Sequence, residues 1–209
     1  MKLGLISDVH ATVEPLREAF TLFRQNHVDA IICAGDTAGY GVELDQTVEL
    51  LIESKCQIIS GNHDTWYLST PVPEGKKWIK DFFSTLPETL DFSADGKHLY
   101  VVHASPPNSD RKGINLLDEH GHVMPDRKTQ WENALEKFDC DVLIVGHTHQ
   151  VFAEKLGDIL VINPGSTKFN HTCAILTLPE MTVQVFPLSN KEPLKTWNWG
   201  QMERMYENG

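Results

Sequence analysis

The first sixty residues alternate short apolar runs with amphipathic segments, and this alternation limits the fold more than any other feature. Apolar runs at residues 2–7, 30–34 and 57–59 are typical of buried strands. Between them lie two helical faces, Leu16, Ala19, Phe20 and Phe23 in the first, and Leu44, Val48, Leu51 and Ile52 in the second. Because strands joined through helices make right-handed crossovers, the alternation predicts a parallel sheet at the start of an α/β fold.

The second half of the chain is richer in strands. Short apolar runs predict strands at residues 90–92, 98–102, 142–145, 151–155, 159–162, 173–178 and 182–186. Two further helices are predicted by apolar faces, one at residues 77–86 with Trp78, Phe82 and Leu86, and one with Trp131, Ala134, Leu135 and Phe138. Parallel units followed by a strand-rich end predict two sheets packed face to face, with helices outside.

No repeat, low-complexity linker or domain boundary interrupts the chain, so we expect one domain over residues 1–209. Residues 106–127 begin with two prolines and have weak periodicity, which we interpret as a long surface excursion. Residues 190–209 form a C-terminal tail. Its tryptophan-rich part, around Trp197 and Trp199, is expected to dock either on the body or on a partner, and the sequence does not choose.

Side chains that can bind metal follow the predicted strands. In chain order they are Asp8, His10, Asp36, Asn62, His63, Asp64, His103, His147 and His149. In open α/β sheets, ligands gather at the carboxyl ends of the strands. A single aspartate there is more often a helix cap or turn residue, and a single histidine a polar boundary residue. Five such groups at successive strand ends predict a metal site instead.

Two pairs of these residues are separated by a single position, Asp8 with His10 and His147 with His149. In extended backbone the two side chains of such a pair point to the same side, so we expect each pair to converge on one metal. Carboxylate, amide and imidazole donors without thiolates suit Mn, Fe, Ni or Zn. Of these, manganese is the ion that we expect.

The candidate ligands fall into five blocks that resemble the signature of the calcineurin-like metallophosphoesterases. The blocks are Asp8-x-His10, Gly35-Asp36-x-x-x-x-Gly41, Gly61-Asn62-His63-Asp64, His103 and Gly146-His147-x-His149, in the family's order. The later Asn163-Pro164-Gly165-Ser166 resembles a turn of the small bacterial and archaeal phosphodiesterase branch, which has no cap domain. The resemblance implies a four-layer α-β-β-α sandwich with two mixed sheets.

The resemblance also implies a role for each residue. It gives one divalent ion to Asp8, His10 and His149, a second to Asn62, His103 and His147, and the bridging position to Asp36. His63 would be the catalytic general acid, and Asp64 would orient it. A hydroxide that bridges the two ions would attack the phosphorus atom of a small phosphorylated substrate.

Two departures from related enzymes bear on the substrate. The second block continues with Thr37, where protein Ser/Thr phosphatases carry an arginine, and the third block ends in Asp64 rather than glutamate. We therefore expect small phosphodiesters rather than phosphoproteins. Arg111 or Lys112 could replace the missing arginine, or could belong to a solvated loop.

Three alternatives stay open. One is a hydrolase of diadenosine polyphosphates or other nucleotides, in which Tyr40 could stack on a base. Another is a phosphomonoesterase of the same fold. The third is a non-catalytic binding scaffold, and the presence of every metal ligand together with His63 argues against it.

The formal net charge of -11 argues against binding to long nucleic acid, which needs a basic surface. Two divalent ions would outweigh the charges of Asp8 and Asp36, so the site itself would attract a phosphoryl group. Neither a membrane span nor a signal peptide is predicted, and the four cysteines show no disulfide or zinc spacing. We therefore expect a cytoplasmic protein without membrane contact. Its oligomeric state, a homo-oligomer included, is not predicted.

Overall fold

The computed structural model describes residues 1–197, which contain five α-helices and ten strands. The helices are α1 (Val13–Gln25), α2 (Leu44–Glu53), α3 (Asn62–Ser69), α4 (Lys77–Ser84) and α5 (Pro125–Leu135), and a 3-10 turn, η1, spans Glu74–Lys76. The strands are β1 (Lys2–Ile6), β2 (Ala30–Cys33), β3 (Gln57–Ile58), β4 (Thr89–Ala94), β5 (Lys97–Val102), β6 (Val142–Ile144), β7 (Val151–Leu156), β8 (Ile159–Pro164), β9 (Thr172–Thr177) and β10 (Thr182–Pro187). Each predicted strand is present, with ends no more than about two residues away.

Both sheets are mixed. The first has the strand order β10-β9-β1-β2-β3, in which β1, β2 and β3 are parallel, as the sequence predicted. The second has the order β4-β5-β6-β8-β7, in which β5, β6 and β8 are parallel and the two edge strands are antiparallel. The parallel strands of each sheet therefore deliver their carboxyl ends to one edge.

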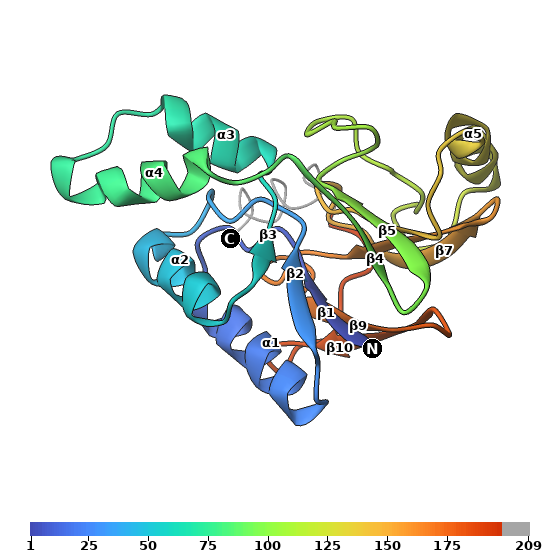
Figure 1. The fold of residues 1–209 in the computed structure, drawn as a ribbon, viewed down its shortest axis with the longest axis horizontal. Coiled ribbons are helices and arrows are strands. Elements are labelled where there is room, and N and C mark those ends of the chain that lie inside the picture. The colour runs from blue at the N-terminus through green and yellow to red at the C-terminus, as the bar shows by residue number, and fades with distance from the viewer. Residues whose placement is uncertain (198–209) are drawn as a thin grey trace, which may run out of the picture.

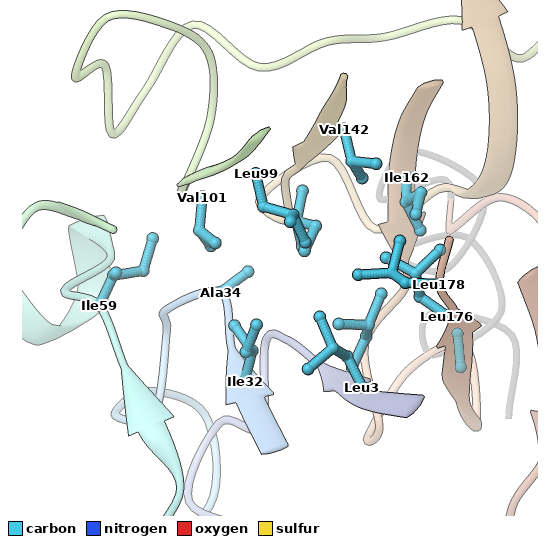
Figure 2. Packing of buried hydrophobic residues seen from close by; sticks show 13 residues of the cluster. Leu3, Ile32, Ala34, Ile59, Leu99, Val101, Val142, Ile162, Leu176 and Leu178 are labelled. Carbon is cyan, nitrogen blue, oxygen red and sulfur yellow. The ribbon is translucent and has the colours of Figure 1, made fainter. Parts of the chain in front are cut away.

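The main core lies between the two sheets, where Figure 2 shows the buried aliphatic side chains meeting. Alternate residues of β1, Leu3 and Leu5, face this layer and are fully buried. They belong to the same cluster as Leu99 and Val101 of β5. Burial on both faces explains why these strands are nearly continuous apolar runs in the sequence.

Helices cover the outer faces and complete four layers. Phe20 and Phe23 of α1 and Leu51 of α2 pack against the first sheet in a second buried cluster. Leu135 of α5 packs against the second sheet. In Figure 1, α1 and α2 lie on one side of the molecule and α5 on the other. The predicted four-layer α-β-β-α sandwich is therefore the fold of this chain.

The structure corrects the account of residues 106–127 as a surface excursion. Ile114, Leu116 and Leu117 are buried, in the same cluster as α5 and the second sheet. A single helix is too narrow to cover five strands, so this loop supplies the rest of the outer layer. The segment also ends earlier than expected, because α5 already begins at Pro125.

The predicted apolar faces of three helices were partly wrong. Ile52 is 50% exposed, although Leu44, Val48 and Leu51 are oriented largely as expected. In α4, Trp78 is 37% exposed and the buried residues are its neighbours Ile79 and Phe83, one position further along. In α5, Ala134 is exposed and so does not belong to the buried face that the sequence predicts.

The first part of the C-terminal tail packs on the body. The backbone N–H of Trp197 donates to the carbonyl oxygen of His149 at 3.1 Å, and its ring lies 4.7 Å from that of Phe169. The expectations for residues 198–209 lie outside the described residues. Within residues 1–197, no helix has both the length and the apolar character needed to cross a bilayer.

Candidate metal centre

The predicted ligands converge where the parallel strands of both sheets end. Asp8 follows β1, Asp36 follows β2, His103 follows β5 and His147 follows β6. Their ligand atoms form three overlapping groups, each with all atoms within 4.8 Å, namely Asp8–His10–His149, His10–Asp36–His63 and Asp36–His103–His147. The geometry thus unites histidines and aspartates that are up to 141 positions apart, from 8 to 149.

The first group comprises Asp8, His10 and His149, all buried. The Nε2 atoms of His10 and His149 lie 3.1 Å apart. The Asp8 Oδ1 atom is 3.2 Å from His149 Nε2 and 3.9 Å from His10 Nε2. Ligands about 2.0–2.2 Å from one ion are spaced at such distances, so a single ion fits this group.

The second group is built around Asn62, at the start of α3. Its Oδ1 atom lies 3.1 Å from His103 Nε2 and 2.9 Å from His147 Nδ1. Asp36 Oδ2 lies 3.4 Å from His103 Nε2. The amide oxygen, two imidazoles and a carboxylate oxygen could therefore hold a second ion. Asp36 also shares a group with His10 and His63, and His10 in turn belongs to the first group.

Backbone carbonyls orient two of the imidazoles for metal binding. The carbonyl oxygen of Ala38 accepts from His10 Nδ1 at 3.0 Å, and that of Ala34 accepts from His103 Nδ1 at 2.7 Å. Because a carbonyl can only accept, each Nδ1 carries a proton, and each Nε2 is the ring nitrogen that lies among the other candidate ligand atoms. Metal-binding histidines almost always donate their other ring N–H in this way, so the donor set fits divalent ions.

Five ligand residues have left-handed backbone, and this overturns the spacing argument for the two pairs. The φ angles are 50° at Asp8, 49° at His10, 56° at Asp36, 65° at His147 and 48° at His149. Left-handed backbone does not alternate sides as a strand does. Accordingly, Asp8 and His10 share one group, but His147 and His149 belong to different groups.

Two glycines allow the ligand loops to approach closely. A Cβ atom on Gly61 would overlap the Oδ1 atom of Asp36, and one on Gly146 would overlap the hydroxyl oxygen of Ser7. Each glycine lies directly before a ligand residue. Larger side chains there would separate the loops and with them the ligands.

The turn at residues 163–166 forms hydrogen bonds with two of the loops that carry candidate ligands. Asn163 Nδ2 donates to the carbonyl oxygen of Gly146 at 2.9 Å. The hydroxyl of Ser166 donates to the carbonyl oxygen of Asp8 at 2.6 Å. Sequence analysis noted this turn through the family resemblance, and the structure gives it this physical role.

Buried charges set the protonation of the ligands. Burial lowers the pKa of His10 to about 4, which favours the neutral imidazole that binds metal. Burial would also lower the pKa of His103, but the adjacent carboxylate of Asp36 raises it to about 10. Burial acts to raise the pKa of Asp8, yet His149 holds it below the ordinary value.

His63 and Asp64 have different surroundings from those expected. His63 is half-buried at the edge of the site, 5.0 Å from the His10 ring, and burial lowers its pKa. The Asp64 carboxylate is buried and accepts from the backbone N–H groups of Ala38 at 2.7 Å and Gly61 at 2.9 Å. It therefore joins two of the loops that carry candidate ligands, and the implied role of orienting the His63 ring stays a prediction.

Aromatic rings surround the ligands, and sequence reasoning found only part of this shell. The Tyr40 ring lies 4.9 Å from His10, and the Phe169 ring stacks 5.2 Å from His149. The Trp66 ring lies 4.7 Å from that of His63. Phe169 follows the 163–166 turn by three residues, and Trp66 lies one turn after His63, so proximity to the motifs was the signal that could have found them.

Residues 1–181 match the calcineurin-like phosphoesterase superfamily domain. The chain belongs to this superfamily. A phosphodiesterase of Methanocaldococcus jannaschii is 26% identical over 197 residues, which cover 92% of this chain and 96% of that protein. A probable metallophosphoesterase of Methanothermobacter thermautotrophicus is 48% identical over 171 residues, 79% of this chain and 77% of that protein.

Solved structures of the superfamily share the fold. A metallophosphoesterase from Sphaerobacter thermophilus has a TM-score of 0.66 at 20% identity, with coverage of 100% of this chain and 95% of that chain. An archaeal phosphodiesterase has a TM-score of 0.58 at 24% identity, with coverage of 90% and 100%. These likenesses confirm the metallophosphoesterase fold. Superfamily membership confirms the predicted class of enzyme, a phosphoesterase that uses divalent metal ions.

Proposed function

We propose that the chain is a binuclear metal-dependent phosphodiesterase of small substrates. The observation that supports this proposal most is that Asp36 belongs to two groups of candidate ligands, one with His10 and His63 and one with His103 and His147. Asp8, His10 and His149 would hold one ion, and Asn62, His103 and His147 the other. The 26% identical phosphodiesterase supports the reaction class. We further propose manganese as the ion, one domain over residues 1–209, and a cytoplasmic location.

When bound, two divalent ions activate water as the nucleophile and offset the charge of the phosphoryl group. The protein supplies the geometry around them. His63, which shares a group with His10 and Asp36, would give a proton to the leaving oxygen. Asp64 would act as a positioning residue, since its carboxylate ties the Ala38 and Gly61 backbones together.

Phosphodiesters fit the charges around the site better than monoesters do. Thr37 stands where a phosphate-binding arginine would follow the bridging aspartate. Arg111 comes instead from the loop before α5, with its guanidinium 5.9 Å from the centroid of the Trp66 ring. A single arginine, 65% exposed, balances the one negative charge of a diester but not the two charges of a monoester.

The test is hydrolysis of bis(4-nitrophenyl) phosphate and 4-nitrophenyl phosphate with Mn, Fe, Ni, Zn or Mg. We expect a higher kcat/KM on the diester, and a loss of more than about 100-fold in Asp36→Asn, since even outer-shell changes cost 10–100-fold. Asp91→Asn, an exposed aspartate on β4, is the matched control and should keep full activity. Metal uptake without turnover of any ester would instead support the scaffold.

The role of His63 is tested in the same assay. His63→Ala should slow esters of poorly acidic alcohols far more than 4-nitrophenyl esters, because the latter leave without a proton. Equal losses on both kinds of ester would remove His63 as the general acid. They would leave a metal-ligand role, which its group with His10 and Asp36 allows.

A further inference from the structure

A pocket of about 540 Å³ opens beside the metal centre, on the side of His63. Its walls come from the loop after β2, from α3 and from the segment that leads to η1. In Figure 1, α3, the segment that follows it and α4 form an arm beside α2. The volume is within the range of about 300–1,000 Å³ that is typical of small-molecule sites.

The walls of this pocket are aromatic and aliphatic. Trp66 and Tyr67 of α3 line it together with Leu44, Val72 and Pro73. Trp66 is 47% exposed, although an indole ring gains free energy when it is covered. An exposed tryptophan next to a catalytic centre provides a stacking surface for a flat ring.

The charges of the pocket favour a neutral occupant. Of the described residues that line it, Lys76 alone carries a permanent charge, and its Nζ atom is paired with Asp45 Oδ1 at 2.9 Å. A phosphate group would find little to neutralise it there. An uncharged ring would find apolar walls.

A second pocket, of about 830 Å³, has His147 in its wall. It is lined by Arg111, Arg127 and Gln150, among other polar side chains. The two ester arms of a substrate at the metal centre would therefore meet unlike surroundings. One arm would meet an apolar pocket with His63 in its wall, and the other a polar, arginine-containing pocket.

We infer that the pocket beside His63 binds the planar aromatic ring of the leaving alcohol, such as the base of a nucleoside. This inference rests on the proposed function, in which His63 protonates the leaving oxygen. Water adds to phosphorus, the bond from phosphorus to the leaving oxygen breaks, and that oxygen takes the proton. The alcohol that carries the ring then departs on the Trp66 side, and a phosphomonoester is left beside His147.

The test compares two methyl phosphodiesters whose leaving alcohols have similar acidity, 4-chlorophenol and hexafluoroisopropanol. Trp66→Ala should lower kcat/KM about tenfold for the aryl ester, as expected for the loss of one ring stack, and leave the fluoroalkyl ester nearly unchanged. Trp66→Phe should retain most of the aryl activity. The matched control is Trp78→Ala, because Trp78 is a partly exposed tryptophan of α4 that does not line the pocket.

Arg111 needs its own control because its guanidinium lies over the Trp66 ring. Arg111→Ala should affect the two esters equally, since it acts on the phosphoryl group. If Trp66→Ala fails to fold, Val72→Asp replaces it, because a carboxylate in the pocket wall should exclude the ring. Equal effects of either pocket variant on both esters, or no effect on either, would overturn the inference.

Binding without turnover separates this inference from the proposed function. Saturation-transfer NMR of adenosine and of 4-chlorophenol with metal-free protein should give signals that Trp66→Ala abolishes and Trp78→Ala retains. Signals from adenosine would identify a nucleoside as the occupant of the pocket. Signals from 4-chlorophenol alone would identify a simple aryl alcohol. Trp66-dependent binding without ester hydrolysis would contradict the proposed function but support the inference that the pocket binds aromatic rings. Absence of binding by both ligands would overturn the pocket.

Discussion

Asp64 lies in the first turn of α3, and both of its carboxylate oxygens accept from backbone N–H groups. One N–H belongs to Ala38, after β2, and the other to Gly61, before α3. Burial raises the pKa of Asp64 to about 7, and Asp36 adds to this effect, while the two N–H groups oppose it. The carboxylate thus holds two ligand loops together from behind.

Replacing Asp64 with alanine would leave those two buried N–H groups without their acceptor. At about 1–3 kcal/mol for each, we expect the free energy of unfolding of the metal-free protein to fall by at least about 2 kcal/mol. Urea denaturation measures the change, with the exposed Asp81→Ala of α4 as control. Lost activity at unchanged stability would show that Asp64 acts on His63 instead.

At this scale the sequence predicts which candidate residues lie together, but it does not predict their backbone geometry. Each ligand follows an apolar strand, and that pattern is visible in the sequence. The left-handed backbone at His147 and His149 is imposed by tertiary contacts, such as the bond from His147 N–H to Asp8 Oδ2 at 3.0 Å. Local spacing therefore could not show that these two histidines diverge.

At the scale of elements, the loop before α5 carries more of the fold than its polar sequence indicated. Ile114 and Leu116 are fully buried against the second sheet. The backbone N–H groups of Leu116 and Leu117 both donate to Gln150 Oε1, at 2.8 and 3.0 Å. The loop is thus fixed to Gln150, the residue that follows His149.

Leu116→Ala should therefore lower the free energy of unfolding by about 2–5 kcal/mol, the range for a buried leucine that leaves a cavity. Lys112→Ala, at an exposed position of the same loop, should change it by less than about 0.5 kcal/mol. Thermal or urea unfolding of both variants gives the comparison. A Leu116→Ala protein as stable as the parent would show that the loop contributes little to the core.

Elements with strong periodicity were predictable, and those shaped by the site were not. The ten strands and α1 have clear apolar patterns, so their predicted positions are confirmed. In α3, by contrast, the sequence from Asn62 to Ser69 has no apolar stripe, because its residues serve the metal centre and the pocket. Its existence became clear only from the backbone.

For the whole molecule, a net charge of -11 would repel an anionic phosphoester. The edge at which the parallel strands of both sheets end is where this repulsion can be overcome. Asp8 and Asp36 place carboxylates at that edge, and two divalent ions bound there would make it positive. The sandwich matters because it directs the carboxyl ends of both sheets to the same place. Neither sheet alone supplies a complete set of ligands.

Anomalous diffraction at the manganese edge, from crystals grown with Mn²⁺, tests this account most directly. We predict two separate peaks in each chain, one beside Asp8, His10 and His149, and one beside Asn62, His103 and His147, with Asp36 in contact with both. In two-metal sites such peaks are roughly 3.5–4 Å apart. A single peak, or two peaks that do not share Asp36, would contradict the binuclear centre.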